Sequence, residues 1–197
     1  VAAPPPLPAV GLASAAGYSI TWDGNDGHFQ NPAAPANAPD NAALAANGTT
    51  AFGSSQLDFG VHFFTNVIDG LYGNGHSWIP DFAANPDPNP YIGLNFGRIV
   101  MIENLAWGRD NGDTTESACG GTCMDRALGL YTIQVTSAEN PGTATQETGD
   151  PATGWATLGT VEYRRTDPPD FNSHLRHRFE VSADGSPIEA TGLRIKV

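Results

Sequence analysis

Two histidines and one group of acidic residues are the first places where this sequence could do chemistry. His174 and His177 lie three positions apart, and His177 falls in a predicted strand over Arg176–Val181. Side chains alternate between the faces of a strand, so an offset of three places the two rings on opposite faces, where they do not bind one ion. The segment Asp23–Gly27, DGNDG, is similar to part of a calcium-binding loop. It lacks the third oxygen ligand and the following Glu, which favours an Asx-rich turn.

Enzyme motifs are absent from the sequence. It contains no G-x-S-x-G nucleophile turn, no H-E-x-x-H zinc motif and no G-x-x-x-x-G-K-[ST] phosphate loop. A pair of carboxylates for glycoside hydrolysis is a spatial arrangement, so its absence does not follow from the sequence. We therefore expect a protein that is not an enzyme.

The only cysteines, Cys119 and Cys123, lie four positions apart in CGGTC. In an oxidising compartment they could form a disulfide that shapes a small loop. The alternative is a metal site, but two thiols without a third Cys or a nearby His do not complete a zinc site.

Charge excludes some partners of this 197-residue chain. Its 21 acidic residues oppose nine basic ones, for a net charge of -12. Such a surface would repel nucleic acid and anionic membranes, whereas it would tolerate calcium. No run of about 18 apolar residues is present to insert into a bilayer.

The first sixteen residues differ from the rest of the chain. They carry no charge and include four prolines within the first eight positions, which favours an extended polyproline conformation. The chain begins at Val1 without an initiator Met or a signal sequence, so we expect a mature exported protein that is secreted or displayed at the cell surface. We expect residues 1–16 to form an extended arm and residues 17–197 a single domain.

Alternating apolar and polar residues predict strands in that domain. The clearest is Tyr131–Thr136, and turn-forming segments rich in Gly, Asn, Asp and Pro separate the candidates. The other predicted strands are Tyr18–Trp22, Tyr91–Leu94, Ile99–Trp107, Ala156–Tyr163, Arg176–Val181 and Leu193–Val197. Only Asn41–Asn47 suggests a helix. Strands without a βαβ rhythm favour an all-β antiparallel sandwich.

Five segments occur in an order that resembles a known family. They are Asn66–Gly70 (NVIDG) followed by Trp78, Tyr91–Gly97 (YIGLNFG), Leu130–Ser137 (LYTIQVTS), Trp155–Gly159 (WATLG) and Thr191–Val197 (TGLRIKV). Together they resemble the discoidin or coagulation factor 5/8 type C family, which is galactose-binding-domain-like and similar to family 32-type carbohydrate-binding modules. The likeness runs from about residue 41 to the end of the sequence.

This resemblance implies a jelly-roll sandwich that holds a structural calcium ion. By position, Asp69 and Glu189 would supply carboxylates, and Asn74 and Ser77 would supply a carbonyl or hydroxyl oxygen. Oxygen ligands of this kind suit Ca²⁺. An ordinary turn aspartate is the alternative for Asp69.

Sugar-binding members of the family use an aromatic platform with polar side chains beside it. The corresponding candidates are Tyr72, His76, Trp107, Arg109, Asp110 and Asn111. Trp107 ends a predicted strand and is better explained as part of the core.

These patterns suggest two functions, of which we expect the first, with the second as its alternative. The first is a structural subunit whose arm packs on a neighbouring copy and forms a filament or surface polymer. In that case the apolar side chains of Val1, Leu7, Val10 and Leu12 would provide the contact. The second is a calcium-supported carbohydrate-binding module that acts in adhesion.

Overall fold

A computed structural model describes residues 10–22, 40–57, 60–71, 76–82, 86–107, 129–163 and 177–197 of the chain. Within these residues the chain forms nine strands and three short 3₁₀ helices. The strands are β1 (Val10–Ser14), β2 (Tyr18–Thr21), β3 (Thr50–Gly53), β4 (Tyr91–Ile102), β5 (Asn104–Trp107), β6 (Gly129–Thr136), β7 (Ala156–Tyr163), β8 (His177–Ala183) and β9 (Ile188–Lys196). The 3₁₀ helices are η1 (Ala45–Asn47), η2 (Phe64–Ile68) and η5 (Pro141–Thr143). No described helix is long and apolar enough to cross a membrane.

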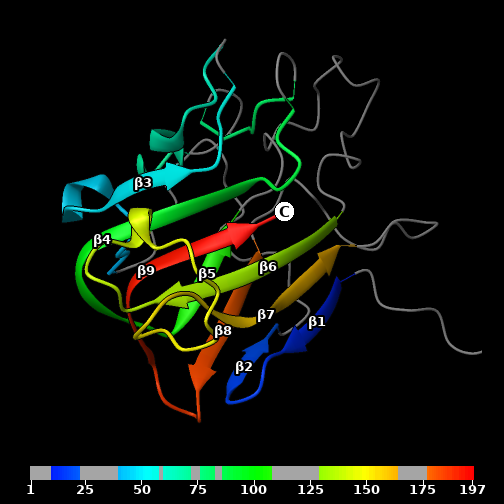
Figure 1. Cartoon of the computed structure of the whole chain (residues 1–197), viewed down its shortest axis with the longest axis vertical. Coiled ribbons are helices and arrows are strands. Elements are labelled where there is room, and N and C mark those ends of the chain that lie inside the picture. The colour runs from blue at the N-terminus through cyan, green and yellow to red at the C-terminus, as the bar shows by residue number, and fades with distance from the viewer. Residues whose placement is uncertain are drawn as a thin grey trace, which may run out of the picture.

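The strands form two antiparallel sheets that pack face to face (Figure 1). One sheet has six strands in the order β1-β7-β6-β9-β4-β3, and the other has three in the order β2-β8-β5. The predicted all-β antiparallel sandwich is therefore confirmed. The chain passes from the larger to the smaller sheet at Glu103, between β4 and β5, where the Glu103 carbonyl accepts a hydrogen bond from the Val181 N–H.

Alternating side chains of both sheets fill the core. Ile133 and Val135 of β6 are fully buried, as is Phe179 of β8 in the opposing sheet. The Phe179 ring lies 4.8 Å from the ring of Trp107, centroid to centroid. Trp107 is thus a core residue, as its place at the end of a strand predicts.

The prediction of an extended arm over residues 1–16 is wrong for its second half, which belongs to the sandwich. Val10–Ser14 is strand β1, which pairs with β7 at the edge of the six-stranded sheet. Val10 is buried, and Leu12 packs against the core of its own domain. The alternation of these larger side chains with Gly11 and Ala13 suits a half-buried edge strand. Val1 and Leu7 lie outside the described residues.

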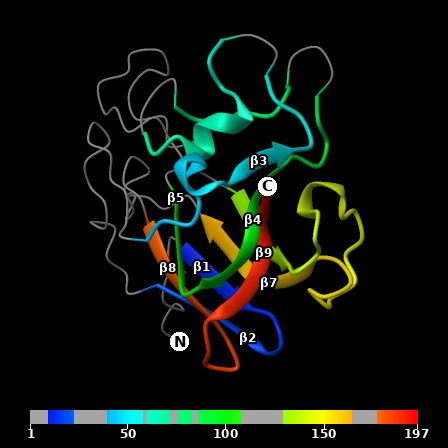
Figure 2. The same cartoon turned by 90° about the vertical axis from the view of Figure 1, so that its left-hand side faces the viewer.

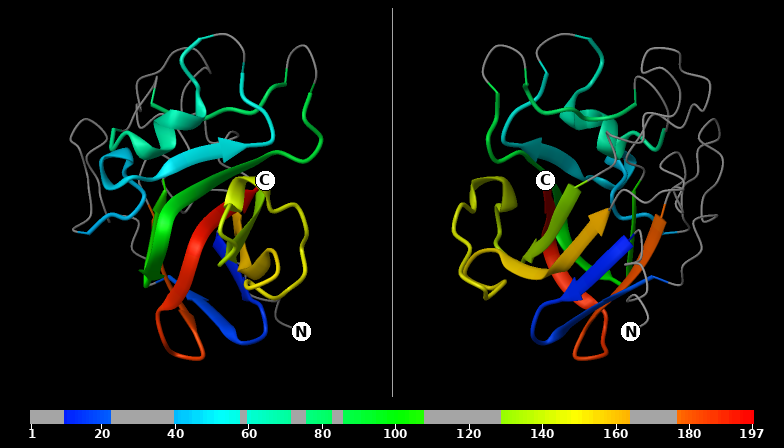
Figure 3. Two further views of the ribbon diagram at one scale, coloured as in Figure 1. Left: turned by 60° about the vertical axis from the view of Figure 1, so that its left-hand side comes forward. Right: turned by 90° about the vertical axis from the view of Figure 1, so that its right-hand side faces the viewer.

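A polar layer covers the outer face of β6 and β9. Arg194 of β9 is buried there and donates to Gln134 Oε1 at 2.7 Å and to Glu147 Oε1 at 3.0 Å. Its guanidinium lies 4.4 Å from the ring centroid of Trp155, which is itself fully buried. Glu147 belongs to the segment 137–155, which lies beside this sheet in both views of Figure 3.

The two ends of the sandwich differ in structure. The β1–β2 and β8–β9 turns, each of which joins one sheet to the other, lie at one end, and the long connection between β3 and β4, which contains η2, lies toward the other (Figure 2). Polar and aromatic side chains gather on that connection.

Candidate functional site

Strand β3 anchors the connection that follows it. The Phe64 ring packs on Gly53, where an added Cβ would lie 2.5 Å from Phe64 Cε1, so only glycine permits this contact. Two hydrogen bonds hold the rest of the connection: Phe64 N–H donates to Gln56 Oε1, and Trp78 Nε1 donates to the Ser55 carbonyl. The connection therefore has a fixed base next to the sheet.

A turn directly after η2 places the first polar side chain. Asp69 Oδ1 accepts the Leu71 N–H at 2.7 Å, which is an Asx turn, and Gly70 adopts a φ of +76°. The other carboxylate oxygen, Oδ2, lies 2.9 Å from His76 Nδ1. Both side chains reach solvent, since 27% of Asp69 and 40% of His76 is exposed.

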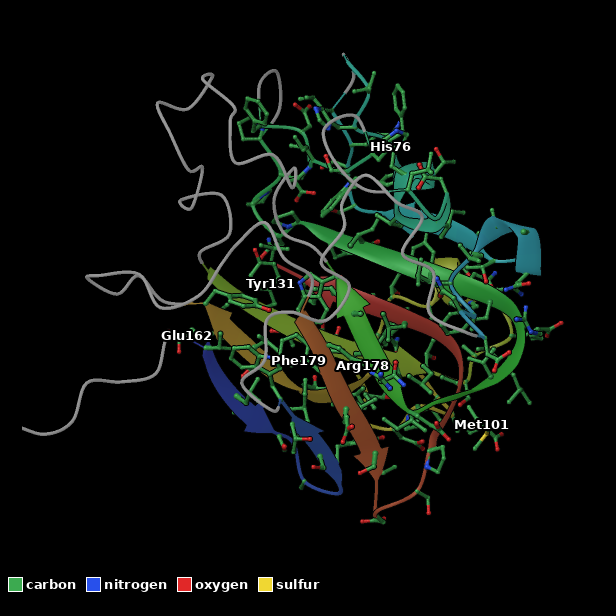
Figure 4. The ribbon with its side chains drawn as sticks, turned by 180° about the vertical axis from the view of Figure 1, so that it is seen from behind. His76, Met101, Tyr131, Glu162, Arg178 and Phe179 are labelled. Carbon is green, nitrogen blue, oxygen red and sulfur yellow. The ribbon has the colours of Figure 1, made fainter. Side chains whose placement is uncertain are left out.

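Further hydrogen bonds join the two stretches of this connection. His62 Nδ1 lies 2.9 Å from Ser77 Oγ, and Asn66 Nδ2 donates to the carbonyls of Val61 and Ser77. We call the five polar side chains of this group the loop-end cluster: His62, Asn66, Asp69, His76 and Ser77. Figure 4 places His76 at this end of the molecule, beside η2.

The Asp69 bond determines what His76 can offer to a ligand. An ionised carboxylate only accepts hydrogen bonds, so His76 Nδ1 carries the hydrogen in this pair. In the neutral imidazole the opposite nitrogen, Nε2, is then an acceptor. His76 can therefore bind a hydroxyl or an amine that donates to it.

Several large apolar residues that lie close in sequence to members of the loop-end cluster are exposed. Phe82 has 60% of its surface exposed and Phe63 has 40%. The others are Val61, Val67 and Leu71. Exposed aromatic rings beside hydrogen-bonding groups can pack on the apolar face of a ring-shaped polar ligand while its edge is hydrogen-bonded.

The structure brings together part of the predicted site. His76, Asp69 and Ser77 lie within the loop-end cluster, but as a hydrogen-bonded group rather than as the predicted separate metal and ligand sites. The sequence analysis missed His62, Phe63 and Phe82. The adjacent His62 and Phe63, one polar and one aromatic, were the available signal. The remaining candidates lie outside the described residues: Tyr72, Asn74, Arg109, Asp110, Asn111, Cys119 and Cys123.

The described members of the predicted calcium set lie beside different parts of β4. Glu189 pairs with Met101, whereas Phe64, five residues before Asp69, packs on Gly53, which pairs with Ile92. Ile92 and Met101 are nine residues apart on β4, roughly 30 Å at about 3.3 Å per residue. Figure 4 likewise shows Met101 far from His76. Within the described ranges, no three His, Cys, Asp or Glu side chains are grouped to hold a metal. Calcium binding stays a prediction.

A second polar surface lies on the outer face of the three-stranded sheet. It is an open recess of about 300 Å³, with Arg178 and two carboxylates among its lining groups. The lining includes Ser19, Thr21, Glu103, Asn104, Arg178 and Glu180. None of its described lining residues is aromatic, so it offers no ring on which a ligand could stack.

Comparison with known proteins supports the fold but no sequence family. No family model and no curated protein sequence matches the chain. Among solved structures, it is similar to the module CpGH89CBM32-5 from Clostridium perfringens, solved with GalNAc-β-1,3-galactose. That match has a TM-score of 0.50 and 14% identity, and it covers 78% of this chain and 86% of the module.

Two other solved structures match with lower scores. The family 32 carbohydrate-binding module of C. perfringens NanJ, in complex with galactose, has a TM-score of 0.43 and 14% identity over 75% of this chain and 80% of its own. Chitosan-binding module 2 of a Paenibacillus sp. IK-5 chitosanase/glucanase, in complex with chitotriose, has a TM-score of 0.45 and 17% identity over 80% and 86%. The resemblance inferred from the five sequence segments is thus confirmed at the level of fold: the chain is a β-sandwich with the galactose-binding-domain-like fold, similar to that of the module CpGH89CBM32-5.

Proposed function

We propose that this protein is a non-catalytic carbohydrate-binding module whose loop-end cluster holds the sugar. The observation that carries this proposal is the combination, on the connection between β3 and β4 of a sandwich with this fold, of exposed phenylalanines and the Asp69–His76 pair. The structural neighbour CpGH89CBM32-5 was solved with a disaccharide, which favours the same class of ligand here. Fold alone does not determine function, so the side chains carry the argument.

A carbohydrate fits the chemistry of this end. A sugar ring presents an apolar C–H face that packs on an aromatic ring, and hydroxyl groups that donate to acceptors such as His76 Nε2. The side chains of His76 and Phe82 are exposed, so they can reach the end of a long or surface-bound glycan. No covalent step is needed, so the proposal requires neither a nucleophile nor an acid–base pair.

Assembly through the N-terminal arm is not part of this proposal. Val10 and Leu12, two of the four residues predicted to contact a neighbouring copy, pack into the domain's own sheet. Their apolar surface is therefore already used within the chain.

Binding to a panel of immobilised glycans tests the proposal. We expect the wild-type chain to bind at least one neutral glycan, and Phe82→Ala and His76→Ala to weaken that binding. Ile99→Ala is the matched control, because Ile99 is 61% exposed and precedes Met101 at the far end of β4. A chain that binds no glycan, or variants at Phe82 and His76 that bind as well as Ile99→Ala, would contradict it.

A further inference from the structure

The first half of the sequence carries acidic side chains but no Lys or Arg. Residues 1–97 contain seven Asp but no Lys, Arg or Glu, and Arg98 is the first basic residue other than histidine. The whole connection that builds the loop-end cluster falls within this half. Arg98 itself is engaged elsewhere, since it donates to the backbone carbonyls of Asn47 and Phe96.

Local donors hydrogen-bond to two carboxylates of this connection, those of Asp69 and Asp87. Asp69 accepts from Leu71 N–H and His76 Nδ1. Asp87 Oδ2 accepts from Ser55 Oγ, and Ser55 also binds the Trp78 ring through its carbonyl. Hydrogen bonding, first from Ser54 and then from Asn89 N–H and Ser55, holds the pKa of Asp87 below its ordinary value.

The loop-end cluster offers hydrogen-bond acceptors to a ligand at Asp69 and His76. Both Nδ2 hydrogen bonds described for Asn66 go to backbone carbonyls, and His76 Nε2 accepts when the ring is neutral. No described Lys or Arg between residues 40 and 97 is present to pair with an acidic ligand. Among the described residues of this connection, a carboxylate or sulfate placed beside Asp69 would therefore meet a like charge and no Lys or Arg to pair with it.

Resting on the proposed function, we infer that the loop-end cluster selects its sugar by charge: it takes neutral and amino sugars, which present donors, and excludes acidic ones. Asp69 is partly exposed, so the effective dielectric lies between about 20 for a protein surface and about 80 for water. At a value of about 40, two unit charges about 6 Å apart repel enough to weaken binding roughly tenfold. Salt reduces such an effect between exposed charges, whereas it leaves a steric exclusion unchanged. Salt dependence therefore separates the two causes.

The test compares sugars that differ in one group. The best neutral binder from the glycan panel is measured beside its C6-oxidised uronic acid and, where it exists, its 2-amino form, by isothermal titration calorimetry at low and high salt. We expect the uronic acid to bind about tenfold more weakly at low salt, with the ratio falling as salt rises, and the amino form to bind at least as well as the neutral sugar.

Asp69→Asn tests the source of the selectivity. It keeps the oxygen that accepts the Leu71 N–H while it removes the charge. The ratio between neutral and acidic sugar should therefore narrow and lose its salt dependence, which a change in the His76 tautomer alone would not cause. Asp184→Asn, in the β8–β9 turn, removes the same charge at the opposite end and should leave the ratio unchanged. Equal binding of neutral and acidic sugars by the wild type at low salt would overturn the charge inference and leave the proposed function intact. Failure to bind any of these sugars would overturn both.

Discussion

His76 Nδ1 and Asp69 Oδ2 lie 2.9 Å apart, although the two residues are separated by a Gly-rich stretch of the chain. The Asx turn at Asp69 directs its carboxylate toward the histidine, and the carboxylate sets which ring nitrogen carries hydrogen. Asp69 is thus a positioning residue for His76 as well as a source of negative charge.

This pairing predicts non-additive effects on binding. His76→Ala should weaken sugar binding about tenfold, the value of one hydrogen bond of about 1.4 kcal/mol. Asp69→Ala should lose part of the same energy because it releases the ring. Calorimetry of the two single variants and the double variant checks this: the double variant should bind little worse than His76→Ala. Fully additive losses would show that the two side chains act independently.

The polar layer over β6 and β9 predicts a pH-dependent contribution to stability. A hydrogen bond from Lys196, together with the charges of Lys196 and Arg194, holds the pKa of Glu147 below its ordinary value of 4.5. A lowered folded-state pKa stabilises the protein above the unfolded-state value and ceases to do so as pH falls through the folded-state value. Glu147→Gln should therefore lower the free energy of unfolding at pH 7, and with it the melting temperature. The expected loss is only about 1 kcal/mol, because Glu147 is partly exposed and water screens its charge.

Thermal melts of Glu147→Gln at pH 7 and pH 3 measure this effect. The deficit should shrink at pH 3, because that pH lies below the unfolded-state value and part of the stabilisation from the lowered pKa is lost there. Glu189→Gln is the matched control, since Glu189 is an exposed glutamate on the same strand as Arg194. An equal deficit at both pH values would contradict the charge-based account.

Removing Arg194 should cost more than removing Glu147. The Arg194 guanidinium donates to Gln134 and lies over Trp155, and burial lowers its pKa, which marks the cost of desolvating it. Arg194→Ala should lower the free energy of unfolding by about 3 kcal/mol, because it leaves Gln134 without this partner and opens a space beside Trp155. Chemical denaturation measures the loss, and a loss no larger than that of Glu147→Gln would be inconsistent with this layer being well packed.

The close pairing of β1 with β7 predicts that Gly159 resists substitution. A Cβ at Gly159 would collide with the Ala13 carbonyl across the β1–β7 pair. Gly159→Ala should therefore destabilise the domain by roughly 1–3 kcal/mol and increase hydrogen exchange of the β1 amides. At Gly142 an added Cβ would make an ordinary 3.6 Å contact, so Gly142→Ala serves as the control. Unchanged exchange in β1 after Gly159→Ala would show that β1 is not held against β7 in this way.

Strand periodicity predicted most of the sandwich because one face of each strand is buried. Ala156–Tyr163 has the same bounds as β7, and Tyr131–Thr136 lies within β6. Strands β1 and β3 were missed because they are short and contain glycine and alanine, so their alternation is weak. Tyr91–Leu94 and Ile99–Trp107 were predicted as two strands. In the structure β4 runs through both, across an irregular region between Asn95 and Val100, and ends at Ile102. The chain then changes sheet at Glu103 and forms β5.

The site was less predictable than the fold. The turn at Asp69 and Gly70 could be recognised because its residue types favour a turn, and His76 follows in a Gly-rich stretch. The hydrogen bond between His62 and Ser77 joins residues fifteen positions apart and depends on how the connection folds back, which local patterns do not encode. The predicted export, the Cys119–Cys123 bridge and calcium binding stay predictions.

Mapping sugar binding by chemical shifts tests the central claim most directly. A ¹⁵N-labelled sample would be titrated with the best neutral glycan from the panel while its amide and imidazole signals are followed. We predict that the largest shifts fall on residues 60–71 and 76–82, with His76 and Asp69 among them. Shifts concentrated instead on the recess of the three-stranded sheet, around Arg178 and Glu180, would contradict a sugar site at the loop-end cluster.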